Sequence, residues 1–287
     1  MKKKLLNILL LFLLIIPVGG CFEGDNKKSN KITTTVYPIE YIINRIDPKE
    51  ETVSIYPNGT NTDEYKLTNK QIDEFAKSTS LFIYNGLTKE KEIARKLVNK
   101  NKKMQIIDVT FGLKFHNSIE ELWLSPSNYL MLCNTVKNDL IEINNNKYKA
   151  TDIENNYHII EEELSILDAN LKAIADNAEE NKKTLVIADK SISFLADYGF
   201  DIVDISDKKE MPDNIKEKFK NKTYTNIYAK ANEDLMDSVK DLVDNYGAKV
   251  TYVNTMNTLT DSEKQSNENY LTIMNRFISD LSNNVLN

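Results

Sequence analysis

The stretch at 152–180, DIENNYHIIEEELSILDANLKAIADNAEE, contains neither proline nor glycine and decides the expected fold. Its apolar residues recur at spacings of four, three, four and three: Ile160, Leu164, Leu167, Leu171 and Ile174. This spacing places them in one stripe, because residues three or four apart share a helix face. A helix of this length extends for about 40 Å. We expect it to span two lobes, the alternative being a long helix packed inside one domain.

Short runs of β-type residues alternate with helical segments on both sides of this stretch. We predict strands at 32–37, 52–56, 81–84 and 105–109, and again at 184–188, 202–205, 226–229 and 249–253. Helices are expected at 38–44, 68–77, 89–98, 192–198, 233–246 and 261–281. Strands that alternate with helices are typical of parallel sheets built from βα units. The expected fold class is therefore α/β, with two similar lobes of parallel four-stranded sheets joined by one long backbone helix.

The first twenty residues have the pattern of an export signal. Lys2, Lys3 and Lys4 precede an apolar run at 5–18, which is short for a transmembrane helix of about 20 residues. The sequence V-G-G-C at 18–21 resembles the lipobox of bacterial lipoproteins, which implies cleavage before Cys21 and a lipid on its thiol. An ordinary signal peptide with an incidental cysteine is the alternative. We expect an extracytoplasmic chain, lipid-anchored to the cell membrane.

The expected organisation of the chain follows from these segments. A polar stretch without hydrophobic periodicity separates the signal from the first strand and predicts a flexible tether. The predicted segments are a signal peptide at 1–20, a tether at 21–31, an N-terminal α/β lobe at 32–151, the connecting helix at 152–180 and a C-terminal α/β lobe at 181–287.

Composition excludes several classes of function. Removing the signal takes away three lysines and no acidic residue, which changes the net charge from −6 to −9 and argues against nucleic acid as a partner. Cys133 is the only cysteine besides Cys21, so neither an intramolecular disulfide nor a cysteine zinc cluster is expected, and Cys133 is predicted to lie in the core. No phosphate-binding glycine motif or catalytic His motif occurs, so we expect no enzyme.

Four local motifs carry a resemblance to a known family. They are T-T-T-V-Y-P-I at 33–39, L-F-I-Y-N-G-L-T-K-E at 81–90, E-E-L-W-L-S-P at 120–126 and N-E-N-Y-L-T-I-M at 267–274. In their order and spacing, over about 31–285, they resemble the zinc/manganese solute-binding proteins of bacterial ABC transporters, the cluster A-I type. The resemblance implies a monomer that captures a divalent cation between its lobes. The implied partners are a membrane permease and a cytoplasmic ATPase.

The resemblance also implies a ligand set, although the family's histidines are replaced here. Family members hold the metal with three histidines and a carboxylate, or with two histidines, a glutamate and an aspartate. The corresponding positions in this chain are Asp63, Glu121, Asp189 and Asn254. The implied neighbours of the cleft are Trp123, Asn85, Glu90 and Lys230, of which Lys230 replaces a family glutamate.

Neither histidine of the chain falls on a ligand position. His116 lies in a polar loop before Glu121 and is expected to be solvated, with a role as an extra ligand as the alternative. His158 lies on the long helix and is expected to be structural. An all-oxygen set suits manganese, calcium or magnesium better than zinc, so we predict that any bound metal is a harder ion than zinc and is bound more weakly. The expected cofactor is a divalent metal ion, manganese-like or zinc.

Lys230 supports an opposing hypothesis. An ammonium group among three carboxylates would neutralise them and repel a divalent cation. The chain would then be a degenerate family member that has lost metal binding and acts as a binding, interaction or adhesion lipoprotein for another ligand.

Overall fold

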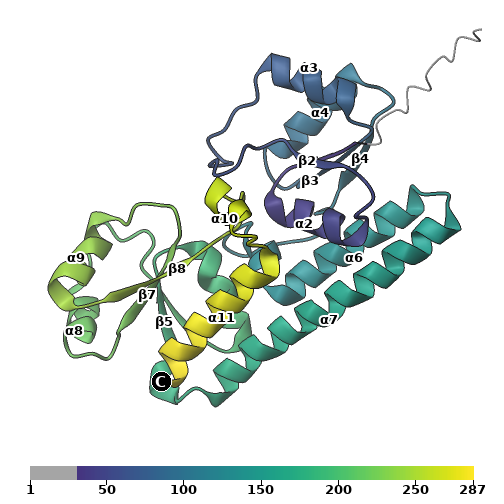
Figure 1. The fold of residues 1–287 in the computed structure, drawn as a ribbon. Coiled ribbons are helices and arrows are strands. Elements are labelled where there is room, and N and C mark those ends of the chain that lie inside the picture. Colours follow the sequence, from purple (N-terminus) through teal and green to yellow (C-terminus); the bar gives the residue numbers. More distant parts are fainter. Residues whose placement is uncertain (1–30) are drawn as a thin grey trace, which may run out of the picture.

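The structure, a computed structural model, describes residues 31–287, so the lipobox and Cys21 lie outside the described residues. Two α/β lobes lie side by side, and the long helix α7 (Lys147–Asn177) runs along both of them (Figure 1). Within the described range, no helix combines the length and apolar character needed to cross a membrane.

Each lobe contains one parallel four-stranded sheet with the same strand order. The N-terminal sheet has the order β2-β1-β3-β4, and the C-terminal sheet has the order β6-β5-β7-β8. The N-terminal strands are β1 (Ile32–Thr34), β2 (Thr52–Ser54), β3 (Leu81–Tyr84) and β4 (Gln105–Asp108). The C-terminal strands are β5 (Thr184–Ile187), β6 (Asp201–Asp204), β7 (Asn226–Lys230) and β8 (Lys249–Val253). The predicted fold class is confirmed.

Helices connect the strands and cover the sheets. In the N-terminal half they are α2 (Tyr37–Ile46), α3 (Asn69–Ser78), α4 (Glu90–Lys100), α5 (Glu121–Leu124) and α6 (Pro126–Glu142). In the C-terminal half they are η1 (Glu180–Lys182), η2 (Lys190–Tyr198), α8 (Asp213–Lys220), α9 (Asp237–Tyr246), α10 (Asp261–Gln265) and α11 (Tyr270–Leu286). Every residue of the central strand β3 is buried, as expected for a parallel sheet with helices on both faces.

The long helix begins earlier than its apolar pattern predicts. Asn146 caps it by accepting hydrogen bonds on its side chain from the N–H groups of Tyr148 and Lys149 at 3.0 and 3.4 Å. The predicted apolar stripe is buried along its whole length and belongs to a core cluster with residues of both lobes. The helix therefore supplies a shared hydrophobic spine to the two lobes.

The last predicted helix is divided in two. Asn267, with φ of 55°, adopts the left-handed conformation between α10 and α11 and interrupts the helical backbone. Asn269 then starts α11 by accepting hydrogen bonds from the N–H groups of Leu271 and Thr272. The prediction of one helix at 261–281 was wrong because asparagine tolerates this conformation and caps the next helix.

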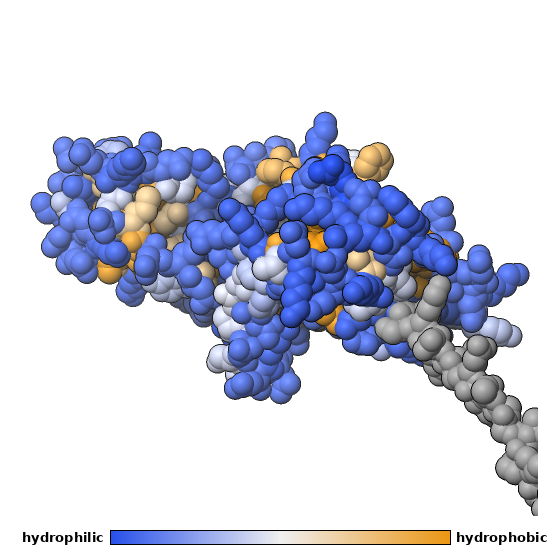
Figure 2. Space-filling model, turned by 90° about the horizontal axis from the view of Figure 1, so that it is seen from above, coloured by the Kyte–Doolittle hydropathy of each residue, from blue (hydrophilic) through white to orange (hydrophobic). Residues whose placement is uncertain are grey.

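The hydrophobic core lies between the sheets and helices of both lobes. Cys133 is a free thiol with no exposed surface, which confirms its predicted place in the core, and burial raises the pKa of that thiol. The face drawn in Figure 2 is mostly hydrophilic, with smaller hydrophobic areas between the hydrophilic side chains.

Candidate functional site

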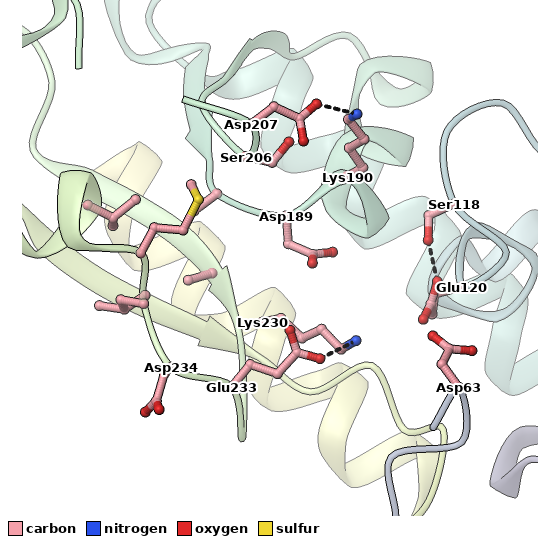
Figure 3. A pocket seen from close by; sticks show the side chains of 15 residues that line it. Asp63, Ser118, Glu120, Asp189, Lys190, Ser206, Asp207, Lys230, Glu233 and Asp234 are labelled. Atoms are coloured by element: carbon pink, nitrogen blue, oxygen red, sulfur yellow. Dashed lines mark hydrogen bonds and ion pairs between the residues drawn. The ribbon is translucent and has the colours of Figure 1, made fainter. Parts of the chain in front are cut away.

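A pocket of about 400 Å³ lies between the lobes, bordered by the carboxyl ends of C-terminal strands and by loops of the N-terminal lobe (Figure 3). The N-terminal lobe contributes Asp63, in the loop after β2, and Glu120, just before α5. The C-terminal lobe contributes Asp189, which follows β5, and Lys230, the last residue of β7. Parallel α/β sheets bind ligands outside the carboxyl ends of their strands, so this pocket is the candidate site.

Asp189 is placed in the pocket by the helix that it starts. One carboxylate oxygen, Oδ1, accepts hydrogen bonds from the Ser191 hydroxyl and from the Ser191 N–H, the latter at 2.8 Å. These bonds cap η2, and Figure 3 shows the carboxylate directed into the pocket. Asp189, one of the four predicted ligands, therefore lines the pocket.

Asp63 reaches the pocket from an exposed loop. The ammonium of Lys89 donates to the main-chain carbonyls of Asp63 and Tyr65, at 2.8 and 2.9 Å, and so holds the loop. The Asp63 N–H donates to the Asn61 side chain at 3.0 Å. These contacts use the main chain of Asp63 and leave its carboxylate to line the pocket (Figure 3).

Glu120, rather than the predicted Glu121, lines the pocket. The buried carboxylate of Glu121 accepts hydrogen bonds from the main-chain N–H groups of His116 and Asn117, at 2.8 and 3.2 Å. It also accepts from the Ser193 hydroxyl of the other lobe at 3.2 Å. Three donors therefore hold Glu121 away from the pocket, and it orders the loop before α5.

The side chain of Glu120 is held at the pocket wall by two polar neighbours. Its carboxylate accepts hydrogen bonds from the Ser118 hydroxyl and, at 3.0 Å, from the Asn257 amide. Only 7% of the residue is exposed, so its charge lies where solvent screening is weak. Sequence reasoning missed Glu120, although the adjacent carboxylates before Trp123 were a visible signal.

Asn254, the fourth predicted ligand, does not line this pocket. Its amide nitrogen donates to the Glu263 carboxylate at 2.5 Å, and its Oδ1 accepts from the Met256 N–H at 2.8 Å. It borders a neighbouring cavity of about 120 Å³ instead. The nitrogen and the oxygen of its amide group are thus both hydrogen-bonded within the segment that follows β8, and neither is directed to the pocket carboxylates.

Lys230 lies in the pocket as predicted, but it has a carboxylate partner of its own. Its ammonium forms an ion pair with Glu233 at 2.6 Å (Figure 3). Burial alone would lower the pKa of Lys230, but the Glu233 hydrogen bond and the charges of Glu120, Glu233 and Asp189 raise it. The lysine is therefore charged.

The other predicted neighbours of the cleft form a buried layer in the N-terminal lobe. Asn85, Glu90 and Trp123 are at most 2% exposed, and the Asn85 N–H donates to the Glu90 carboxylate at 2.9 Å. Next to them, Gly86 donates its N–H to Asp108 at 2.9 Å. A Cβ at Gly86 would lie 1.8 Å from that carboxylate, so this close approach requires glycine.

The two histidines lie outside the pocket. His116 is exposed, as expected for a solvated loop residue. His158 is an exposed residue of α7, and its ring nitrogen Nδ1 lies 3.0 Å from Glu161. Within residues 31–287, no three His, Cys, Asp or Glu side chains come close enough together to hold a metal ion.

Two lobes with one parallel sheet each, one connecting helix and a polar pocket at the strand ends define a class of protein. It is the substrate-binding class of metal-ion ABC transporters, in which a single long helix joins the lobes. The family model described as "Zinc-uptake complex component A periplasmic" matches residues 32–284. The chain belongs to this family.

Solved structures show the same fold. The zinc-bound ZnuA-like domain of Streptococcus pneumoniae AdcA is 22% identical with a TM-score of 0.72, and the match covers 90% of this chain and 99% of that one. The metal-dependent lipoprotein YcdH of Bacillus subtilis is 20% identical with a TM-score of 0.72 and the same coverage. The periplasmic zinc-binding protein TroA of Treponema pallidum is 17% identical with a TM-score of 0.67, covering 88% and 98%.

Proposed function

We propose that this chain is the extracytoplasmic substrate-binding component of an ABC transporter and captures a divalent cation between its lobes. The observation that carries the proposal is that Asp63, Glu120 and Asp189, from both lobes, line one pocket of a zinc-uptake family member, although they do not form a closed metal cluster. The partners are the permease and the ATPase of that transporter. A lipid on Cys21 would hold the chain beside them.

The charge of the pocket supports a cation as its ligand. Six carboxylates and two lysines line it: Asp63, Glu120, Asp189, Asp207, Glu233, Asp234, Lys190 and Lys230. The lysines pair with Asp207 and Glu233, both at 2.6 Å. No ion pair within residues 31–287 involves the remaining four carboxylates. With four more carboxylates than lysines, the pocket has a net negative formal charge that attracts cations.

The donor atoms favour a hard ion. The pocket offers carboxylate and hydroxyl oxygens and no imidazole or thiolate from the described residues. Such oxygens suit manganese, magnesium or calcium, whereas zinc prefers nitrogen and sulfur. We therefore infer manganese-like specificity, with Glu120 in the place that the family resemblance gives to Glu121.

A titration tests this function. Chain purified without a histidine tag is titrated with MnCl2 and with ZnCl2, and affinity is measured by calorimetry and by the shift of the melting temperature. Saturation at about 100 times Kd stabilises the chain by about 2.7 kcal/mol. Glu120→Gln is expected to weaken binding at least about tenfold, because it removes a carboxylate charge from the pocket. The matched Glu121→Gln retains binding. No shift with either ion in the unaltered chain refutes cation capture.

The same titration measures the effect of the pocket lysine. Lys230→Gln is expected to tighten Mn²⁺ binding about tenfold or more, because a positive charge within about 4–6 Å of a bound cation opposes it. Lys190→Gln is the control, since Lys190 also lines the pocket but its side chain is 45% exposed and pairs with Asp207. Equal affinities in the two variants would rule out competition by the Lys230 ammonium.

A further inference from the structure

The loop after β4 presents an apolar side chain to solvent. Phe111 is 86% exposed, the largest exposed fraction of any large apolar side chain among residues 31–287. It lies in a turn in which the Leu113 N–H donates to the Thr110 carbonyl at 2.9 Å. Gly112 follows it with φ of 81°, a conformation that glycine adopts readily. Leu113 packs against the core, so the turn is anchored while Phe111 projects from it.

Two further exposed apolar side chains belong to the same end of the sheet. Phe115, four residues after Phe111, is 39% exposed, and Leu87, in the loop after β3, is 42% exposed. The two loops are joined, because the N–H of Gly86 donates to the Thr110 hydroxyl at 3.0 Å. Single exposed apolar residues are ordinary, but three on two joined loops indicate a contact surface. We call Leu87, Phe111 and Phe115 the apolar tip.

The loop that carries the apolar tip borders the inter-lobe pocket. It continues directly into Ser118 and Glu120, which line that pocket. Just before them, the Asn117 amide donates to the Ser193 hydroxyl of the C-terminal lobe at 3.0 Å. The position of the tip relative to the pocket is therefore fixed by contacts with both lobes, and a partner that held the tip would also orient the pocket.

The charge around the tip differs from that of the chain as a whole. The chain has a net charge of −6, but the segment TFGLKFHN at 110–117 contains Lys114 and His116 and no acidic residue. The side chains of Phe111, Lys114 and Phe115 are all exposed. Exposed phenylalanine beside lysine is typical of segments that lie in the interface of a bilayer, where lysine is attracted to anionic head groups.

The length of the predicted tether permits this end of the lobe to reach a membrane. Ten residues lead from Cys21 to Lys31 and span at most about 36 Å when fully extended. The tip follows the carboxyl ends of β3 and β4, whereas Lys31 precedes β1 at the amino end of the same sheet. A strand as short as β4 rises only about 13 Å, so a tether of this length can pass along the lobe.

Building on the proposed function, in which a lipid on Cys21 holds the chain, we propose that the apolar tip is a second membrane contact. Phe111 and Phe115 insert at the boundary between head groups and acyl chains, and Lys114 contacts anionic head groups. The lipid and the tip together set the orientation of the chain. They direct the pocket, which the same loop borders, toward the membrane surface on which a permease opens.

Tryptophan fluorescence tests this contact. The chain contains one tryptophan, Trp123, which is 1% exposed and gives a constant background. Phe111→Trp is purified from membranes with its lipid and reconstituted in vesicles of phosphatidylglycerol and phosphatidylcholine, with and without brominated acyl chains. The added emission is expected to shift to shorter wavelength and to be quenched by the brominated chains. An intact mass without a lipid overturns the proposal at its first step.

Tyr148→Trp is the matched control. Tyr148 is 85% exposed and lies at the amino end of the same lobe, where its neighbour Lys149 pairs with Asp47 at 2.8 Å. Quenching of Phe111→Trp is expected to exceed that of Tyr148→Trp at least about threefold, because contact with acyl chains requires insertion of the residue. Stronger quenching of Tyr148→Trp would mean that the opposite end faces the bilayer, and it overturns the proposal.

Phe111→Ser separates a membrane contact from a protein contact. It is expected to bind Mn²⁺ in solution as the unaltered chain does, and to reduce Mn²⁺ uptake by cells. Reduced uptake without quenching of Phe111→Trp overturns the membrane contact and assigns the tip to a protein partner. Quenching in a chain that binds no Mn²⁺ refutes cation capture and leaves the membrane contact standing.

Discussion

At the scale of single residues, Glu90 is a buried carboxyl group with an unusual environment. It is 2% exposed, and no ion pair within residues 31–287 involves it. Burial raises the pKa of Glu90 from its ordinary value of 4.5 to about 7, against the opposing effect of hydrogen bonds such as the one from the Asn85 N–H. The folded chain therefore keeps a proton on Glu90 at pH values where the unfolded chain has released it.

This pKa predicts a pH dependence of stability. Because the folded pKa is raised, the contribution of Glu90 is fully present below about pH 4.5 and is lost as the pH rises through about 7. Glu90→Gln removes this loss, since glutamine stays neutral and still accepts from the Asn85 N–H. Between about pH 4.5 and 8, the variant should gain up to about 3 kcal/mol relative to the unaltered chain.

Urea unfolding at the two pH values measures this gain. Glu74→Gln, on an exposed position of α3, is the control and should show no such drift. A difference between Glu90→Gln and the unaltered chain that does not change with pH would contradict the buried, protonated carboxyl.

At the scale of elements, α7 illustrates how one helix divides its residues between core and solvent. Leu167 is 1% exposed, and its neighbour Ile166 is 54% exposed. The two side chains are similar in size and adjacent in sequence, but they lie about 100° apart around the helix. They therefore form a matched pair for measuring how much the buried stripe contributes to the free energy of unfolding.

Alanine substitutions should separate the two faces of α7. Leu167→Ala is expected to lower the free energy of unfolding by about 2–5 kcal/mol, because it leaves a cavity in the core that joins the lobes. Ile166→Ala should change it by no more than about 0.5 kcal/mol. Urea denaturation of both variants measures the two changes. An equal decrease in the free energy of unfolding would mean that the buried stripe contributes no more to stability than the exposed face does.

At the scale of the whole molecule, side-chain contacts reinforce the connection made by α7. The Trp123 ring nitrogen donates to the Thr255 carbonyl at 2.7 Å, which links the region of α5 to the loop after β8. The Tyr270 hydroxyl donates to the Trp123 carbonyl, also at 2.7 Å, and ties in α11. One core cluster contains residues of both lobes. These contacts oppose a hinge between the lobes.

We therefore predict little closure when a ligand binds. The radius of gyration from small-angle X-ray scattering should change by less than about 1 Å when saturating MnCl2 is added. Local movement of the loop that carries Asp63 would then suffice for release. A decrease of several ångströms, as expected for hinge closure of two lobes, would contradict this prediction.

Local patterns in the sequence determined the architecture and part of the site. The apolar stripe of α7 and the β-type runs could be recognised from their periodicity. An element with one buried face shows this periodicity regardless of which distant residues it packs against. Asp63, Asp189 and Lys230 line the pocket, and each lies in a loop or at the end of a strand, where βα units present their side chains.

Only the tertiary structure decided which neighbouring side chain enters the pocket. Glu121 is turned away by the main chain at 116–117 and by Ser193, which lies 72 residues further along the chain. The Asn254 amide is held by the Glu263 carboxylate. Which of these side chains lines the pocket depends on hydrogen-bond donors and acceptors that only folding brings together. The spacing of residues in the sequence therefore does not predict it.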